Sequence, residues 1–387
     1  MGTLRWLTAG ESHGPALTAI LEGCPAGLEV SREAIDHELG RRQRGYGRGE
    51  RMSIEQDRVT FAGGVRYGRT TGAPLALTVA NRDAANWGDT LSADAPGQGA
   101  EAAEPVTVPR PGHADLGGAL LYDLHDIRPV IERASARETA ARVALGAVAK
   151  ALLGAVGCRV ASHVVAVGGV TSGAELTLDA VERVEADPMR CADPRASERM
   201  RAAVDDAVAR GDTLGGVVEV VTWGCPQGVG SYVQGDRRLQ SALAAAVFTV
   251  PAIKGVEFGL GFAAAALPGS RVHDAIGYGD EGYARGANNA GGIEGGISTG
   301  APIVLRAAMK PISTLRSPLP SVDLRTHRAV ESRFERSDTC AVPAAGIVLE
   351  AVVALTLARE VLERFGGATV DDLRAAVAAY AARVRAR

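Results

Sequence analysis

The chain has 387 residues, of which 46% are hydrophobic and 22% are charged, and its formal net charge is −3. This composition excludes a mainly disordered chain, and the length allows one large domain or two to three smaller ones. Aromatic residues make up only 4% of the chain and do not alternate with basic residues, as they do in proteins that stack single-stranded nucleic acid. We therefore expect no nucleic-acid partner.

The two longest apolar stretches, around residues 341–358 and 239–253, are interrupted by Glu350 or by polar residues and Pro251. Neither supplies the roughly 20 apolar residues that a membrane-spanning helix needs, so no membrane association is expected. The first residues lack the apolar segment and cleavage site of a signal peptide. This favours a cytoplasmic location.

Short β-like runs predict strands at residues 4–8, 16–21, 75–79, 160–170, 217–222 and 303–308. They alternate with helical stretches, but without the regular strand-helix repeat of a doubly wound sheet. Residues 92–104 have the composition of an exposed loop or insertion. This order of elements predicts an α+β fold.

The clearest helix is predicted to start at Ser135, whose side chain can cap an amide three residues on while Glu138 reaches back, forming a capping box. Apolar residues then recur at helical spacing as far as Leu152, which predicts one buried face.

A second helix is predicted after Pro343. It is apolar on nearly all sides up to Ala358, with Glu350 as the exception, so we expect it to lie between two layers of the fold. Gly366 and Gly367 are expected to end it.

The five cysteines are far apart and show no CxxC spacing. This argues against both a disulfide framework and a structural zinc site. We expect reduced, mostly packed thiols and no metal. The cysteines are Cys24, Cys158, Cys191, Cys225 and Cys340.

Two short motifs are weak signals. Residues 259–264 fit the GxGxxA dinucleotide pattern, but Pro268 leaves no room for the helix that would hold a pyrophosphate. Residues 296–300 (GISTG) fit the GxSxG pattern of serine hydrolases, but a strand-like run follows where a nucleophile elbow requires a helix. We expect neither chemistry.

Residues 41–51 (RRQRGYGRGER) hold five arginines separated by glycines. Glycine lets the backbone approach an anion and arginine supplies bidentate donors, so this segment is predicted to be a loop that closes over the substrate. The alternative is a flexible loop that binds RNA nonspecifically, and the segment alone does not separate the two. Arginine, lysine, serine and histidine also gather at residues 110–115, 132–138, 309–314 and 336–338, so a small polyanion is the simplest common ligand.

Three long segments carry a resemblance to a known family: GESHGPALTAILEGCP (10–25), ERASARETAARVALGAV (132–148) and RSDTCAVPAAGIVLEAV (336–352). Shorter ones lie between them, namely RRQRGYGRGERM, RPGHADLGG, PAIKGVEFG, NNAGGIEGGISTG and MKPIST. With these segments the chain resembles the chorismate synthase family from end to end.

The resemblance implies a single domain over residues 1–387, a β-α-β sandwich of antiparallel sheets around central helices, and a homotetramer. It implies a lyase of aromatic amino-acid biosynthesis, which converts 5-enolpyruvylshikimate 3-phosphate to chorismate by 1,4-elimination of phosphate. The reaction needs reduced FMN. Whether the chain reduces its own flavin with NADPH or relies on a separate flavin reductase is left open.

The resemblance also assigns residues. Those that would hold substrate anions or the phosphates of a nicotinamide donor are Arg42, Arg48, Arg51, Arg110 and Arg137. Those that match flavin contacts are Arg133, Ala134, Ser135, Pro251, Ala252, Gly295, Lys310, Pro311, Ile312, Ser313, Thr314 and Arg336. Proline has no amide hydrogen, so residue 251 can contribute only a carbonyl.

Three residues are implied to be catalytic. His13 is assigned to the leaving phosphate and His113 to N1 of the reduced flavin, since histidine exchanges protons near neutral pH. Asp338 would keep the flavin N5 available for the proton lost from the substrate ring. Another flavin-dependent lyase that eliminates phosphate is the alternative enzyme, and a nucleic-acid-binding protein acting through residues 41–51 is the alternative from a different class.

Overall fold

The computed structural model describes residues 4–49, 56–88, 90–94, 103–279, 282–335 and 337–387. Its first sheet has four antiparallel strands in the order β1-β2-β6-β3. They span β1 Arg5–Ala9, β2 Ala16–Glu22, β6 Leu75–Ala80 and β3 Val59–Gly63. Buried residues alternate along β2 and β6, so one face of this sheet packs against the interior.

The second sheet has five antiparallel strands in the order β10-β15-β9-β7-β8. They span β10 Ile253–Phe258, β15 Ile303–Met309, β9 Gly216–Trp223, β7 Arg159–Val167 and β8 Val170–Thr171. The central strands β7 and β9 carry runs of consecutive buried residues, which is the pattern of strands covered on both faces.

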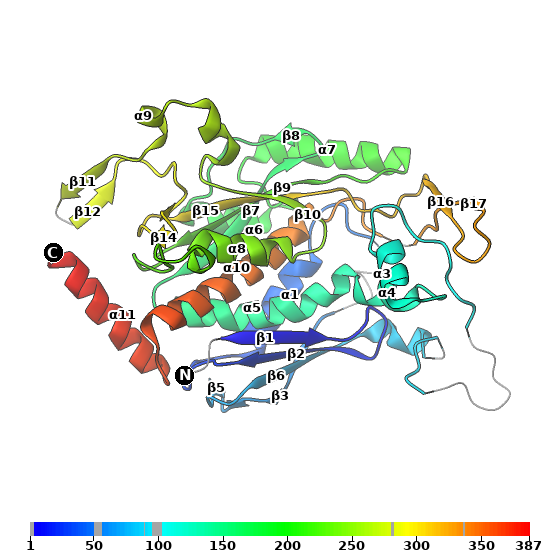
Figure 1. The fold of residues 1–387 in the computed structure, drawn as a ribbon, viewed down its shortest axis with the longest axis horizontal. Coiled ribbons are helices and arrows are strands. Elements are labelled where there is room, and N and C mark those ends of the chain that lie inside the picture. Colours follow the sequence, from blue (N-terminus) through cyan, green and yellow to red (C-terminus); the bar gives the residue numbers. More distant parts are fainter. Residues whose placement is uncertain (1–3, 50–55, 89, 95–102, 280–281, 336) are drawn as a thin grey trace.

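Three helices lie between the two sheets (Figure 1), namely α1 Arg32–Gln43, α5 Thr139–Gly154 and α10 Val342–Phe365. Helix α5 contacts β2 and β6 of the first sheet, whereas α10 contacts β7 and β9 of the second. Helices α5 and α10 also pack directly on each other. A Cβ atom at Gly146 of α5 would lie 2.3 Å from the Cβ of Ala351, so only glycine allows this close approach.

Smaller elements surround this centre. The other α-helices among the described residues are α3 Asp115–Tyr122, α4 Arg128–Arg133, α6 Val181–Ala186, α7 Pro194–Arg210, α8 Leu239–Phe248, α9 Gly269–Val272 and α11 Val370–Arg385. The small hairpins are β4 Val65–Arg66 with β5 Arg69–Thr70, β11 Ile276–Gly279 with β12 Gly282–Arg285, β13 Ile293–Glu294 with β14 Ile297–Ser298, and β16 Pro320–Val322 with β17 Ala329–Glu331.

The predicted strands and the mixed α+β class are confirmed. Each of the six predicted runs contains a strand, although the run at 160–170 is divided between β7 and β8 by Gly168 and Gly169, both of which have positive φ. Of the predicted loop at 92–104, residues 95–102 lie outside the described residues, and the parts on either side are exposed.

The predicted capping box is wrong. The Ser135 side chain accepts from the amide of Arg137, at the start of a short 3-10 turn, and α5 itself begins at Thr139. Glu138 does not reach back to Ser135, because its carboxylate accepts hydrogen bonds from Thr8 and Arg142. Hydrogen bonds from Thr8 of β1 and from Arg142 of α5 thus take the place of the predicted capping box.

The prediction for the second helix is confirmed. Helix α10 is buried along nearly its whole length, and Gly366, with φ of 71°, follows its last residue. The five cysteines are free and buried, as predicted. Across the described residues, no helix has both the length and the apolar character to cross a bilayer.

The two weak motifs have structural roles. The GxGxxA segment leads into a 3-10 helix at Gly261–Ala266 and the four-residue α9, with Pro268 between them. Ser298 of GISTG is buried, donates to the carbonyl of Pro226 and accepts from the amide of Val229. As predicted, strand β15 and not a helix follows it.

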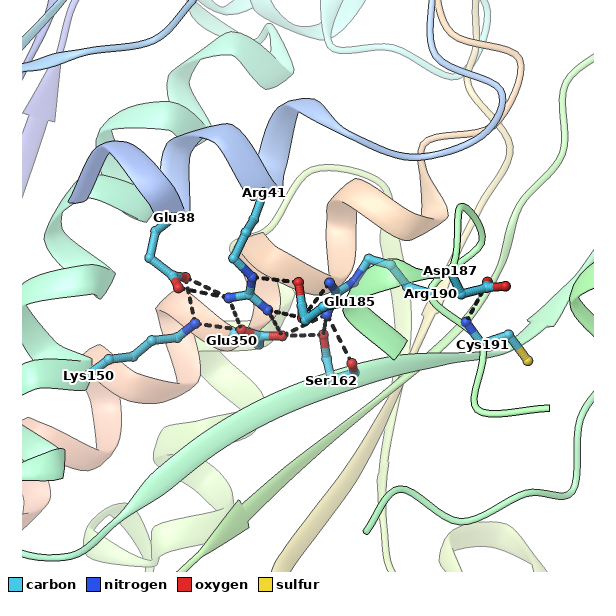
Figure 2. A network of polar contacts seen from close by, with 9 residues as sticks. All are labelled: Glu38, Arg41, Lys150, Ser162, Glu185, Asp187, Arg190, Cys191 and Glu350. Carbon is cyan, nitrogen blue, oxygen red and sulfur yellow. Dashed lines mark hydrogen bonds and ion pairs between the residues drawn. The ribbon is translucent and has the colours of Figure 1, made fainter. Parts of the chain in front are cut away.

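Glu350, the one charged residue in the apolar part of α10, is fully buried at the centre of an ion network (Figure 2). Its carboxylate accepts hydrogen bonds at 2.7–3.1 Å from Arg41 of α1, from Ser162 of β7 and from Arg190, which follows α6. It also accepts from Lys150 of α5. Burial alone would raise the pKa of Glu350, but Lys150, Arg41 and Arg190 lower it far below its ordinary range. Three cations thus surround this carboxylate.

Two further carboxylates complete the network. Glu38 accepts from Arg41 and Lys150, and Glu185 accepts from Arg41 and Arg190. Three cations and three carboxylates are thus joined by ion pairs. Asp187, also drawn in Figure 2, accepts from the Cys191 backbone amide and takes no part in these ion pairs. Because the group is neutral and richly hydrogen-bonded, it can be buried, and it joins α1, α5, α10 and the β7 sheet at one point.

Replacing Glu350 with glutamine should leave a cation of this network without its countercharge. We expect the free energy of unfolding, measured by urea denaturation at pH 7, to fall by about 3–5 kcal/mol, as when one member of a buried ion pair is removed. The control is Glu22→Gln, because Glu22 pairs with Arg5 at the surface, and its loss should stay below about 1 kcal/mol. Equal losses in the two variants would contradict a central role for Glu350.

The Glu350→Gln variant should also show a changed pH dependence. Because folding lowers the pKa of Glu350, its contribution to stability is complete above the ordinary value of 4.5 and is lost as the pH falls below it. The glutamine side chain of the variant does not titrate, so the free energy of unfolding of the variant should fall less steeply below pH 4.5. Urea denaturation at a series of pH values measures this, and parallel curves for the two proteins would contradict it.

Candidate active site

The N-termini of α5 and α10 lie at the same end of the molecule (Figure 1). At this end Met309 of β15 pairs with Gly216 of β9, and Leu214 forms a bridge to Cys340, just before α10. Arg142, in the first turn of α5, donates to the carbonyl of Thr249, the residue directly after α8. Helix N-termini carry a partial positive charge, so two of them favour the binding of anions here.

His13 is held by a buried glutamate. Its ring Nδ1 lies 2.9 and 3.0 Å from the two carboxylate oxygens of Glu132, and its backbone amide donates to the same carboxylate. The ring stacks on Trp87 at 4.2 Å between centroids. Asp83 lies on the other side of the ring, with its Oδ2 4.0 Å from Nε2. Glu132 therefore engages Nδ1 by hydrogen bonds, whereas Nε2 faces Asp83 at a longer distance.

Arg42 and Arg137 meet at a buried aspartate. Arg137 donates to Asp57 at 2.6 Å and to Asn81 at 2.8 Å, and a terminal nitrogen of Arg42 lies 3.5 Å from the second oxygen of Asp57. Arg42 also donates to Thr139 and to the carbonyl of residue 136. Burial lowers the pKa of Arg42, with Asp57 opposing the shift and Arg137 and Arg48 adding to it. These two arginines thus concentrate positive charge beside the start of α5.

His113 belongs to a second cluster, formed by the turn before α3. Its Nδ1 is hydrogen-bonded to the fully buried carboxylate of Asp115, which also accepts from Arg110 at 2.8 Å. Burial alone would raise the pKa of Asp115, but the hydrogen bonds from His113 and Arg110 lower it well below its usual range. Arg110 reaches Thr314, with a separation of 3.5 Å.

Lys310 and Ser313 lie beside the same turn. A Cβ atom at Gly112 would be 3.9 Å from the Lys310 Nζ and 3.7 Å from the Ser313 Cβ. Burial, and then the nearby Lys254, lower the pKa of Lys310. Within the described part of the chain, no carboxylate pairs with either lysine. The Lys310 backbone amide donates to the carbonyl of Ala252, so the turn at Pro251 and Ala252 adjoins this segment.

Asp338 lies at a third cluster, where it accepts from Arg48 at 2.7 Å and from the amide of Gly49 at 2.7 Å. The neighbouring Ser337 donates to the carbonyl of Thr314. A cavity of about 30 Å³ adjoins Asp338 and Thr314, which is room for only a water-sized molecule.

Asn81 links the His13 loop to the pair of Arg42 and Arg137, because its side-chain amide donates to the carbonyls of Glu11 and Gly14 and its oxygen accepts from Arg137. Electrostatic interactions of Arg42 with Arg48 and Asp338 connect this pair to the third cluster. Ser135 donates to Ser12, next to His13, while Arg133 donates to the carbonyls of Thr8 and Gly10. Thr314 contacts both the Arg110 cluster and, through Ser337, the Asp338 cluster. The predicted site residues of this end therefore form one contiguous group, and besides those already described it includes Ala134, Pro311 and Ile312 through chain continuity.

Gly295 is not brought to this group. It lies in the turn between β13 and β14, and Gly292 of this hairpin approaches Pro302 and Ile303 at the start of β15. Lys310 follows the other end of β15, whose seven residues span about 20 Å at 3.3 Å per residue. Arg51 and Arg336 lie outside the described residues.

The prediction that residues 41–51 form a single loop is wrong for its first part. Helix α1 extends to Gln43, and both Arg41 and Arg42 in its last turn are buried. Arg41 belongs to the Glu350 network, so these two arginines are not available to a nucleic-acid backbone. Residues 44–49 form irregular structure, and 50 and 51 lie outside the described residues.

Sequence reasoning missed four residues of this site: Glu132, Asp115, Asp57 and Trp87. The first two lie inside the segments ERASARE and RPGHAD, where a carboxylate beside a histidine or arginine was a usable signal for Asp115. Glu132 is 119 positions from His13, and no local pattern could have paired them.

The comparisons with known proteins agree with one another. The family described as "Chorismate synthase" matches residues 4–362. A protein named "Chorismate synthase" from Geobacillus kaustophilus (strain HTA426) is 54% identical over 376 residues, covering 96% of this chain and 97% of its own. One of the same name from Trichlorobacter lovleyi (strain ATCC BAA-1151 / DSM 17278 / SZ) is 54% identical over 381 residues, with the same coverage.

A solved structure, titled "Crystal Structure of Chorismate Synthase", is similar along the full length of both chains, with a TM-score of 0.80 and 40% sequence identity. Sequence and fold therefore point to one family over nearly the whole chain. The chain belongs to the chorismate synthase family.

Proposed function

We propose that this chain catalyses the 1,4-elimination of phosphate from 5-enolpyruvylshikimate 3-phosphate to give chorismate, with reduced FMN bound. One observation carries the proposal. In a member of this family, the segments around His13, His113 and Asp338 are far apart in sequence but are connected through Asn81, Arg42 and Thr314. Four arginines belong to this group, and Lys310 lies beside it.

The charge of the site fits this substrate. The substrate carries a phosphate and two carboxylates, and a chain of net charge −3 must concentrate cations locally to bind it. Arg42 and Arg137 share Asp57, whereas Arg48 and Arg110 each have an aspartate of their own. Arg110 also lies 3.5 Å from Glu335, so the four arginines have four carboxylate partners. The excess positive charge therefore comes from Lys254 and Lys310, which have no such partner among the described residues.

The residues around Lys310 fit a flavin phosphate. Burial and the nearby Lys254 lower the pKa of Lys310, and no carboxylate of the described residues offsets them. A bound phosphate would supply the missing countercharge. Lys310, Ser313, Thr314 and Arg133 would hold the cofactor. When bound, reduced FMN would offer an electron-rich ring whose N5 can take up the proton lost from the substrate.

The side chains have distinct tasks in this proposal. His13 donates a proton from Nε2 to the departing phosphate, since its Nδ1 is engaged by Glu132. His113, with Nδ1 engaged by Asp115, holds a proton at Nε2 toward the flavin ring. Asp338 is fixed by Arg48 and the Gly49 amide. It would keep the flavin N5 available to accept the proton that the substrate ring loses. The ring proton and the phosphate leave the substrate, so the reaction has no net redox change.

Several finer points belong to the same proposal. The largest hydrophobic core includes residues from Leu4 to Leu373, beside two smaller clusters, which supports a single domain over residues 1–387. The layers of Figure 1 support the β-α-β sandwich. We also propose a homotetramer. Because Gly295 is far from Lys310 of its own chain, in such a tetramer it would contact the flavin that is bound by another subunit. A cytoplasmic location, NADPH as electron source and a separate flavin reductase stay predictions.

The proposed reaction is tested by an anaerobic assay with photoreduced FMN and 5-enolpyruvylshikimate 3-phosphate, followed by an aerobic assay with NADPH alone. We expect chorismate and phosphate in equal amounts in the first assay. Absence of chorismate would refute the proposal. Turnover in the second assay would show that the chain reduces its own flavin.

Arg48→Ala should weaken substrate binding. The loss of charge-assisted hydrogen bonds worth about 1.5–3 kcal/mol should raise the Michaelis constant about tenfold or more. The control is Arg44→Ala, since Arg44 lies in the same segment and is exposed without a described ion pair. An unchanged Michaelis constant in the Arg48 variant, with unchanged turnover, would remove this arginine from the site.

Lys310→Ala should weaken FMN binding while leaving the fold intact, because a point charge is lost from an anion site. Equilibrium titration by flavin fluorescence measures the effect, with Arg325→Ala, at an exposed turn, as the control. If both variants bind FMN as tightly as the parent protein, Lys310 has a structural role.

A further inference from the structure

Glu132 fixes the loop that carries His13 at three points. Its carbonyl accepts from the Ser12 amide at 3.2 Å, and its carboxylate accepts from the His13 amide at 2.8 Å and lies 2.9 Å from the His13 Nδ1. The residue is only 2% exposed and lies in the last turn of α4. A buried carboxylate of this kind needs donors around it, and His13 supplies two of them.

The other sides of the imidazole ring are also constrained. Trp87 stacks on its face, with an interplanar angle of 21°, and the Trp87 indole donates to Asp83 at 3.3 Å. The Asn81 amide donates to the carbonyls of Glu11 and Gly14 on either side of the loop. Ring and backbone are thus held from the edge, the face and both flanks.

We propose that Glu132 is a positioning residue for His13, which keeps the ring proton on Nδ1 and leaves Nε2 as the nitrogen that exchanges a proton with the substrate. This inference rests on the proposed function. Without an acceptor at Nδ1, the proton can move to Nε2, and the ring can rotate by half a turn about its Cβ–Cγ bond. His13 donates from Nε2 only when both ring nitrogens are protonated, and the Glu132 carboxylate stabilises this charged form and keeps the remaining proton on Nδ1 afterwards. Loss of the acceptor would therefore weaken the acid, and rotation would turn Nε2 away from the substrate.

The carboxylate is required and an amide does not replace it. Both oxygens of Glu132 accept, one from the backbone amide and both within reach of Nδ1. A glutamine has a single acceptor oxygen, and its NH₂ group would favour an unprotonated Nδ1. Glu132→Gln therefore preserves the size of the side chain while it reverses the preferred position of the ring proton.

The protein offers a matched control. Glu219 is a second buried glutamate bonded to a histidine, His163, at 3.0 Å, and it also accepts from Arg306. This pair lies within the β7, β9 and β15 sheet and not beside His13. Glu219→Gln should therefore lower stability without changing the turnover number.

The kinetic test is a double-mutant cycle on the full-length protein with reduced FMN. Glu132→Gln should lower the turnover number about 10–100-fold, the range seen when a carboxylate that orients a metal-bound histidine is lost, with little change in the Michaelis constant. In a His13→Ala background the same change should have no further effect, because the residue acts through His13. An equal loss in both backgrounds, or no loss in either, would overturn the proposal.

A second measurement does not depend on activity. ¹⁵N NMR of the histidine-labelled parent protein, with the His13 signals assigned by their loss in His13→Ala, reports which ring nitrogen carries the proton in the neutral form. We expect Nδ1 in the parent protein and a shift toward Nε2 in Glu132→Gln. A proton on Nε2 in the parent would refute the positioning role even if the variant failed to fold. If the expected tautomer is seen but no chorismate forms, the proposed function fails and the orienting contact stands.

Discussion

The buried charge of Glu350 is the constraint around which the two sheets and their helices are arranged. A single ionised carboxylate in an otherwise apolar helix must have partners, and the chain supplies them from α1, α5, β7 and the segment after α6. The separation between these elements is thereby fixed (Figure 2). Arg41 and Arg42 are adjacent at the end of α1, yet Arg41 enters this network and Arg42 enters the candidate active site. The internal network and the site are thus joined by one helical turn.

At the site, the same rule of paired charges holds in a looser form. The arginines form ion pairs with Asp57, Asp115 and Asp338, and these carboxylates orient the guanidinium groups before an anion binds. The lysines lack such partners among the described residues, so binding of an anion there would remove a repulsion and not merely exchange one partner for another. Two helix N-termini add to this preference. The site therefore combines preoriented donors with a deficit of negative charge, as binding of a polyanion requires.

Much of the fold could be predicted from the sequence because strands and buried helices leave periodic patterns. The apolar run after Pro343 predicted the central helix, and even its exception, Glu350, marked the central ion network. Prediction failed where a distant residue takes over a local group. Glu138 accepts hydrogen bonds from Thr8 and Arg142 and does not cap Ser135. The segment after Arg41 was predicted to be a loop because of its glycines, although α1 continues to Gln43. At the site, the histidines came from family resemblance, whereas the contact of His13 with Glu132 depends on folding.

The central claim is that His13, His113 and Asp338 surround one pocket for flavin and substrate. A crystal structure of the protein with FMN and 5-enolpyruvylshikimate 3-phosphate tests it most directly. The account predicts the flavin phosphate beside Lys310, the substrate phosphate within hydrogen-bonding distance of the His13 Nε2, and Asp338 beside the flavin ring. Ligands bound elsewhere, with these three side chains outside any shared pocket, would contradict it.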